Sequence, residues 1–104
     1  MRDEHARSIV DSLAALRGVE ARAMFGGHGL YRDDEFFGIV WRGHLYFRTD
    51  ETTRGDYLAA GSKPFRPRAR MKSKRYFEVP LAVLENPPVL VAWALKAVAA
   101  RRSG

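Results

Sequence analysis

The chain has no cysteine, and none of its apolar stretches approaches the roughly 20 residues that a membrane-spanning helix needs. The absence of cysteine excludes disulfides, thiolate nucleophiles, iron–sulfur clusters and cysteine-bearing zinc sites. Charged and polar residues stand at positions 2–5, where the apolar segment of a signal peptide would have to begin. We therefore expect a cytoplasmic protein with no membrane partner.

What the chain does have is an ordinary globular composition with an excess of positive charge. Its 104 residues are 46% hydrophobic and 29% charged, which suits one domain spanning residues 1–104. Lysine and arginine number 18 against 12 aspartates and glutamates, so the formal net charge is +6. Such a balance favours acidic partners, nucleic acid first among them.

Hydrophobic periodicity predicts helices at both ends of the chain and strands between them. A helix is expected over residues 3–17, and an N-cap at Asn86 predicts a last helix that ends near Arg102. Residues 51–60 and 81–85 are predicted to be short helical segments. Strands separated by tight turns are predicted at 20–26, 28–32, 36–42, 44–49 and 75–79. We therefore expect an α+β fold with an N-terminal helix, an antiparallel β-meander of four to five strands, and C-terminal helices packed on the sheet.

A glycine-rich run, Met24-Phe25-Gly26-Gly27-His28-Gly29-Leu30-Tyr31, is followed by Phe37-Gly38-Ile39-Val40 and Leu45-Tyr46-Phe47-Arg48. Further markers come in order: Tyr57, Gly61, Phe65, Tyr76-Phe77-Glu78-Val79-Pro80, Leu84, Leu90, Trp93 and Ala97. Together they resemble the N-terminal domain of the TfoX/Sxy competence regulators over nearly the whole chain. The resemblance implies an α+β domain that, in these positive regulators of DNA-uptake genes, is joined to a second, C-terminal domain, and it brings no catalytic residues. We expect this chain to be a stand-alone version of the domain, without the C-terminal one.

No group of residues has the spacing of a catalytic, cofactor or metal site. The glycines at 26–29 lack the spacing of phosphate-binding loops and lie between two predicted strands, so we interpret them as a turn. The histidines His5, His28 and His44 lie on different predicted elements, although neighbouring strands could still bring the last two together. We expect a protein that is not an enzyme, with no cofactor, no metal and no small-molecule substrate.

The sharpest feature is a basic segment over residues 63–75, with no acidic residue between Asp56 and Glu78. If the segment is extended, its alternate cations form a ladder that can track a phosphate backbone. The alternative is a solvated loop, or one paired with acids elsewhere in the fold. With one strand arginine added, the candidate nucleic-acid-binding residues are Lys63, Arg66, Arg68, Arg70, Lys72, Lys74, Arg75 and Arg48.

Aromatic residues also interleave with arginines along the predicted strands 36–42 and 44–49. On an open sheet this pattern can stack bases while the arginines neutralise phosphates, but strand aromatics are more often packed in a core. We assign Phe37, Ile39, Trp41 and Phe47 to the core, and expect Tyr46 and Arg48 to be exposed.

The last predicted helix is apolar nearly all round, because Lys96 is the only polar residue between Val89 and Ala100. Such a helix is either wedged between several neighbours or covered by a second chain. The candidate interface residues are Val89, Leu90, Val91, Trp93, Leu95 and Val98. Two functions follow. One is a non-enzymatic regulatory domain that acts through protein–protein contacts, self-association included; the other is a small basic protein that binds nucleic acid through the basic segment.

Overall fold

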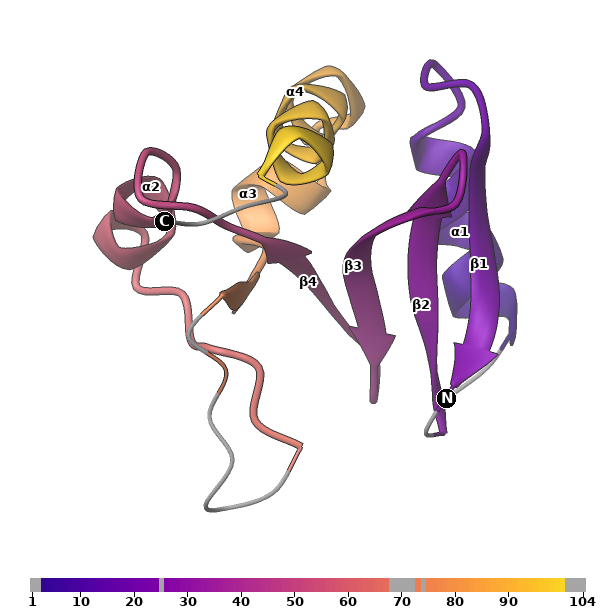
Figure 1. Ribbon diagram of the computed structural model, residues 1–104, viewed down its shortest axis with the longest axis horizontal. Helices are drawn as coiled ribbons and strands as arrows, with labels where there is room; N and C mark the ends of the chain where they lie inside the picture. Colours follow the sequence, from indigo (N-terminus) through magenta and orange to yellow (C-terminus); the bar gives the residue numbers. More distant parts are fainter. Residues whose placement is uncertain (1–2, 25, 68–72, 74, 101–104) are drawn as a thin grey trace.

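In the computed structural model, which describes residues 3–24, 26–67, 73 and 75–100, the described chain forms four helices and five strands. The helices are α1 (Asp3–Ser12), α2 (Arg54–Ala59), α3 (Leu81–Leu84) and α4 (Pro87–Ala99). The strands are β1 (Val19–Met24), β2 (Gly27–Arg32), β3 (Glu35–Trp41), β4 (His44–Arg48) and β5 (Tyr76–Glu78). The predicted α+β order, with a helix first, then the meander and then C-terminal helices, is confirmed (Figure 1).

The five strands form one antiparallel sheet in the order β1-β2-β3-β4-β5. Two-residue turns join β2 to β3 and β3 to β4, and their residues Asp33, Asp34, Arg42 and Gly43 all have positive φ. A left-handed conformation at both turn positions defines the type I′ turn, whose twist matches that of antiparallel strands. These tight hairpins keep neighbouring strands adjacent, as the sequence predicts.

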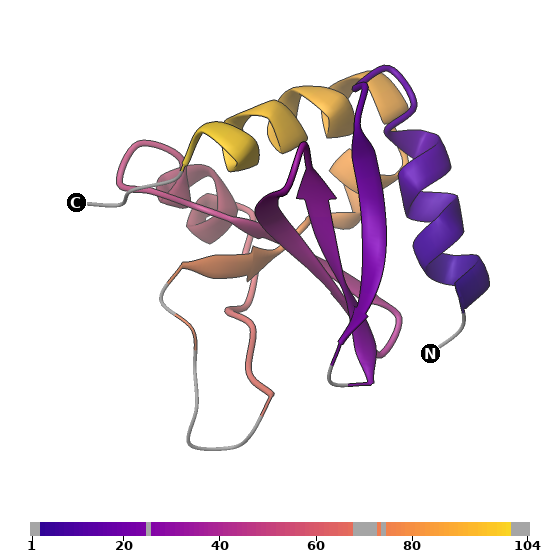
Figure 2. The same cartoon turned by 45° about the vertical axis from the view of Figure 1, so that its right-hand side comes forward.

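The hydrophobic core lies between the helices and one face of the sheet. Figure 2 shows α1 alongside β1, with α4 running across the top of the sheet in that view. Burial of each large side chain here contributes about 1.5–3 kcal/mol. The largest fully buried apolar side chains come from the turn that follows α1, from α4 and from the three central strands: Phe37, Phe47, Leu13, Leu30, Leu45, Leu90 and Val40.

The N-terminal helix is shorter than predicted, because α1 ends at Ser12 rather than at residue 17. Beyond it the backbone tightens into turns, in which the N–H of Leu16 donates to the carbonyl of Leu13 at 2.8 Å. Both leucines remain buried, so the apolar spacing identified core residues correctly but not the end of the helix. Gly18, which follows these turns, has a left-handed backbone conformation, with φ 82°.

Helix α4 begins where the sequence predicts, at Pro87 with Asn86 as its N-cap, and ends at Ala99. The predicted end near Arg102 lies outside the described residues. With 13 residues, α4 is the longest helix of the described part of the chain. None of the helices described is both long enough and apolar enough to span a membrane.

The assignment of Trp41 to the core is wrong. Strand β3 pairs with β2 through a register shift between Leu30 and Tyr31, and the pairing skips Phe37. Because this bulge interrupts the side-chain alternation, Phe37 turns into the core, while Trp41 lies on the opposite face together with Ile39, which is nevertheless buried as expected, at 6% exposure. A half-buried tryptophan therefore stands on the side of the sheet away from the helices.

The turn before α2 is held by the carboxylate of Asp50, three residues before the N-cap Thr53. Its Oδ1 accepts from the backbone N–H groups of Thr52 and Thr53 at 2.8 and 3.1 Å, and from the Thr52 hydroxyl at 2.6 Å. The hydrogen bond from that hydroxyl, followed by those from the backbone, holds the pKa of Asp50 below its usual value. The helix itself begins later than predicted, at Arg54 rather than residue 51.

Replacing Asp50 with alanine is expected to lower the free energy of unfolding by about 1 kcal/mol at neutral pH. Because the folded-state pKa is lowered, the contribution is present above the unfolded pKa of about 4 and is lost as the pH falls through the folded value. Urea unfolding at about pH 7 and pH 3 checks this. The Asp50→Asn control keeps an acceptor without a titrating group. A difference between wild type and Asp50→Ala that stays constant with pH would contradict the assignment.

Candidate functional site

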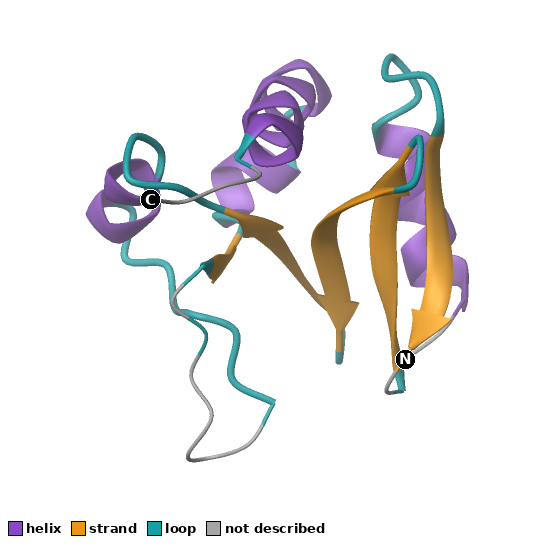
Figure 3. Cartoon of the chain, in the orientation of Figure 1, coloured by secondary structure: helices purple, strands orange, loops and turns teal. Residues whose placement is uncertain are grey.

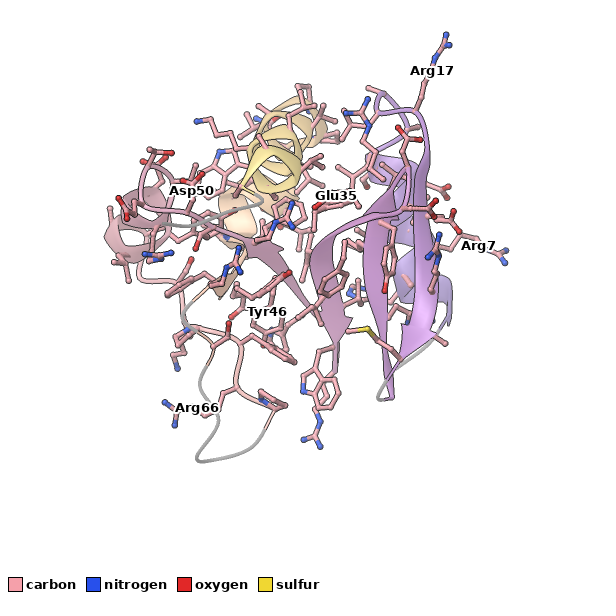
Figure 4. All side chains as sticks on the ribbon, in the orientation of Figure 1. Arg7, Arg17, Glu35, Tyr46, Asp50 and Arg66 are labelled. Atoms are coloured by element: carbon pink, nitrogen blue, oxygen red, sulfur yellow. The ribbon has the colours of Figure 1, made fainter. Side chains whose placement is uncertain are left out.

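The face of the sheet opposite the helices, called the open face below, is lined by aromatic rings. In the described part of the chain no helix covers it, and Figure 4 shows Tyr46 on it. One group consists of Tyr31, Phe36 and Tyr76, whose successive ring centroids lie 5.2 and 5.5 Å apart. A second group lies towards the basic segment and consists of Trp41, Tyr46 and Phe65.

The first residues of the basic segment extend the sheet beyond β5. The N–H of Glu78 donates to the carbonyl of Lys63 at 2.9 Å, and that of Phe65 donates to the carbonyl of Tyr76 at 2.8 Å. Pro64 bridges to Phe77 between them. This pairing makes the start of the segment extended, and Figure 3 shows the loop that follows α2 leading away from the end of the molecule where α4 lies.

Phe65 is carried by this pairing onto the open face. Its ring centroid lies 5.7 Å from that of Trp41 and 5.0 Å from that of Tyr46, and both contacts are edge-to-face. Such contacts contribute about 0.5–1.5 kcal/mol beyond the area they bury. The aromatic residue therefore anchors the base of the basic segment against β3 and β4.

A cavity of about 700 Å³, called the basic–aromatic cavity below, opens beside these rings. Three elements form it: the β3–β4 hairpin, the start of the basic segment and β5. Its three permanent cations face a single carboxylate, Glu78, whose Oε2 lies 2.5 Å from Nδ1 of His44. The lining residues are Trp41, Arg42, His44, Tyr46, Lys63, Pro64, Arg66 and Glu78.

Tyr46 and Tyr76 on the open face have raised pKa values and are neutral at physiological pH. Burial, and to a smaller extent the carboxylate of Glu78, raises the pKa of Tyr46. Burial likewise raises the pKa of Tyr76, against the opposing effect of two arginines. Neutral phenols next to Arg42, Lys63 and Arg66 do not repel an anion, so the cavity can hold an anionic group and an aromatic or apolar group side by side.

The structure brings only part of the predicted basic set to this site. Lys63 and Arg66 are exposed and line the basic–aromatic cavity. Arg75 is half-buried, and its carbonyl accepts from the backbone N–H and hydroxyl of Thr49 at 2.6 and 2.7 Å. The others lie outside the described residues: Arg68, Arg70, Lys72 and Lys74.

The expectation that Arg48 is exposed and contacts nucleic acid is wrong, because its side chain is only 8% exposed. Nε and Nη2 donate to the carbonyls of Ala97 and Val98 at 3.1 and 2.8 Å, at the C-terminal end of α4. Nη1 pairs with the carboxylate of Glu35 at 3.0 Å. The guanidinium thus joins β3, β4 and α4. Its positive charge interacts favourably with the negative, C-terminal end of the α4 dipole.

The predicted interface residues on α4 do not share one face. Leu90 is completely buried in the core, so its assignment to an interface is wrong. Trp93 is half-buried, with its ring 4.7 Å from that of Tyr57. Val91 and Val98 are half-buried, whereas Val89 and Leu95 are 36% and 44% exposed. Helix α4 packs against α1, α3 and the sheet, and these contacts account for most of its apolar residues.

The sequence interpretation missed Trp41, Arg42, His44 and Glu78 as members of one site. The hairpin turn Trp41-Arg42-Gly43-His44 was a usable signal, because a tight turn places its flanking residues side by side at a sheet end. The contact between His44 and Glu78 could not be predicted from the sequence, because it depends on how β5 pairs with β4. Within the described residues, no three histidine, aspartate or glutamate side chains are grouped as metal ligands.

The described chain is thus an α+β domain with helices on one face of an antiparallel meander and aromatic and basic side chains on the other. The family model of the TfoX N-terminal domain matches residues 11–101, and the chain belongs to this family. Membership supports a regulatory, competence-type role. No curated protein matches the chain in sequence.

Proposed function

We propose that this domain acts in regulation by binding nucleic acid on its open face, without catalysing a reaction. The observation that carries the proposal is the basic–aromatic cavity, where Arg42, Lys63 and Arg66 surround rings that no described helix covers. The only carboxylate among the lining residues, Glu78, is engaged by His44. The net charge of +6 adds a long-range attraction for phosphate groups.

Phosphate contacts of this kind release condensed counterions, so the binding constant falls steeply with salt. On a single strand, each phosphate contact contributes about 0.7 to the slope of log K against log salt. Lys63 and Arg66, which enter the cavity from the basic segment, should therefore each contribute about 0.7 to this slope.

The variant Lys63→Ala/Arg66→Ala is expected to bind single-stranded DNA about tenfold more weakly at about 50 mM salt. The magnitude of its salt slope should fall by about 1.4, because two phosphate contacts are removed. Fluorescence anisotropy of labelled single-stranded and duplex DNA at about 50 and 200 mM salt measures both quantities.

The matched control is Lys96→Ala/Arg7→Ala, which removes one lysine and one arginine from exposed positions on α4 and α1. Figure 4 shows Arg7 and Arg66 on opposite sides of the molecule. We expect the control to change affinity only slightly, through net charge. Equal losses in the two variants would show that binding follows net charge alone and would contradict a site at the cavity.

Self-association through α4 is a second candidate, favoured by the exposure of Leu95 and Val89. Leu95 lines a shallower concavity of about 450 Å³ together with Val98, Arg32 and Glu35. If this surface forms a dimer, sedimentation at tens of micromolar should show it, and Leu95→Glu should shift the species to monomer. A monomer at that concentration would remove this candidate and leave the nucleic-acid proposal intact, because the two surfaces do not share residues.

A further inference from the structure

We infer that the nucleic acid bound on the open face is single-stranded, and that one of its bases enters the basic–aromatic cavity and stacks on Trp41 or Tyr46. This inference rests on the proposed function, because it specifies which form of nucleic acid the same site selects. Its distinctive claim is that the bases, as well as the phosphates, contribute to affinity.

The arrangement of the rings is the first step. Trp41 and Tyr46 lie on the two strands of the β3–β4 hairpin, and Phe65 meets each of them edge-to-face, at interplanar angles of 87° and 66°. Neither ring pair is stacked. The Arg42 guanidinium lies over the Trp41 ring, 5.4 Å from its centroid, so a base that stacks on that face of Trp41 takes the place of this cation. No stacked ring pair has to separate, and base stacking on aromatic rings is tolerant of base identity.

The distribution of polar groups is the second step. The cations Arg42, Lys63 and Arg66 suit phosphate oxygens, whereas Glu78 would repel them. Glu78 is held by His44 at 2.5 Å and its side chain is 33% exposed, so it presents an acceptor suited to the N–H groups of a base edge. A carboxylate among cations fits a nucleotide, which offers an anion at one end and N–H donors at the other.

The size and shape of the cavity make the third step. A volume of about 700 Å³ falls within the range of small-ligand pockets, roughly 300–1,000 Å³, and can take a nucleotide unit. In a duplex the bases are paired and stacked inside the helix, and bringing one onto a protein ring requires unstacking it. A single strand meets no such cost, so the cavity should select it.

The test compares three labelled probes of equal length, about 12 nucleotides: oligo(dT), an abasic oligodeoxyribose phosphate, and a duplex containing the oligo(dT) strand. We expect oligo(dT) to bind at least tenfold more tightly than the abasic probe at the same salt. Equal binding of the oligo(dT) and abasic probes, or tighter binding of the duplex, would overturn the inference and leave phosphate-driven binding standing. If none of the three binds, the proposed function fails as well.

A second readout places the base. In a Trp93→Phe background Trp41 is the only tryptophan, and oligo(dT) should quench its emission while the abasic probe should not. Tyr46→Ala should weaken oligo(dT) binding about tenfold and abasic binding less than twofold, whereas Tyr46→Phe should retain affinity. If oligo(dT) at saturation leaves Trp41 emission unchanged, and a folded Tyr46→Ala variant keeps its affinity for oligo(dT), the placement of a base on Trp41 or Tyr46 is overturned.

Discussion

Replacing Arg48 with methionine is expected to lower the free energy of unfolding by about 3 kcal/mol, the low end of the cost of breaking a buried ion pair. The substitution removes the ion pair that Nη1 makes at 3.0 Å with the carboxylate of Glu35, whose side chain is 31% exposed. It also removes the donors at 3.1 and 2.8 Å from the carbonyls of Ala97 and Val98, of which Ala97 keeps the backbone N–H of Ala100 at 3.2 Å. Methionine preserves much of the apolar volume, so the loss reports the polar contacts.

Urea unfolding of Arg48→Met, compared with Arg17→Met, measures this effect. Arg17 is exposed, and Figure 4 shows its side chain projecting away from the molecule, so its replacement should change stability by less than about 0.5 kcal/mol. The double variant Arg48→Met/Glu35→Gln should recover part of the loss, because the carboxylate is then neutral. A loss below about 1 kcal/mol in Arg48→Met would contradict a structural role for this arginine.

The second large effect is expected at Gly27, where alanine should cost about 3 kcal/mol. A Cβ at this position would lie 2.3 Å from the carbonyl oxygen of Val40 and 3.3 Å from the Trp41 ring. The carbonyl belongs to the central strand β3 and cannot move without disturbing its pairing with β2, so the cost falls at the upper end for overpacking. The same substitution would displace Trp41 on the open face.

Gly55→Ala is the matched control, with an expected change of the opposite sign. Gly55 lies in α2, its φ is not in the left-handed region, and a Cβ there would meet nothing within 4 Å. Alanine at such a position restricts the unfolded chain and should stabilise the protein by about 0.5 kcal/mol. Urea unfolding of Gly27→Ala and Gly55→Ala measures the change in the free energy of unfolding for each variant, and we expect the two changes to have opposite signs. A destabilisation at Gly27 no larger than about 1 kcal/mol would contradict the close packing.

Local patterns predicted the fold well because its connections are short. Two-residue turns at positions 33–34 and 42–43 force adjacent strands to pair, and the apolar spacing of Leu13 and Leu16 marks a core face whether or not the backbone stays helical. The bulge at Phe37 was not readable, because it depends on how β3 fits against β2. That single irregularity moved Trp41 from the expected core to the open face.

The site was predicted only in part, for a physical reason. The density of positive charge along the sequence located the basic segment. It could not distinguish a cation that is buried and paired within the fold from one that is exposed on the surface. Arg48 is buried by contacts with Glu35 and the end of α4. These partners lie 13 and about 50 residues away along the chain, so its burial could not be predicted from the local sequence. The cation set of the cavity is instead completed by Arg42, which a hairpin turn brings opposite Lys63 and Arg66.

The most direct test of the account is an NMR titration of the two tryptophan indole N–H signals with oligo(dT). Trp41 lines the basic–aromatic cavity, whereas Trp93 packs on Tyr57 on the helical side of the sheet. The chain has only these two tryptophans, so each signal can be assigned with one variant. We predict that the Trp41 signal shifts progressively to saturation while the Trp93 signal stays in place. A shift confined to Trp93, or no shift of Trp41 under conditions where anisotropy shows binding, would contradict a nucleic-acid site on the open face.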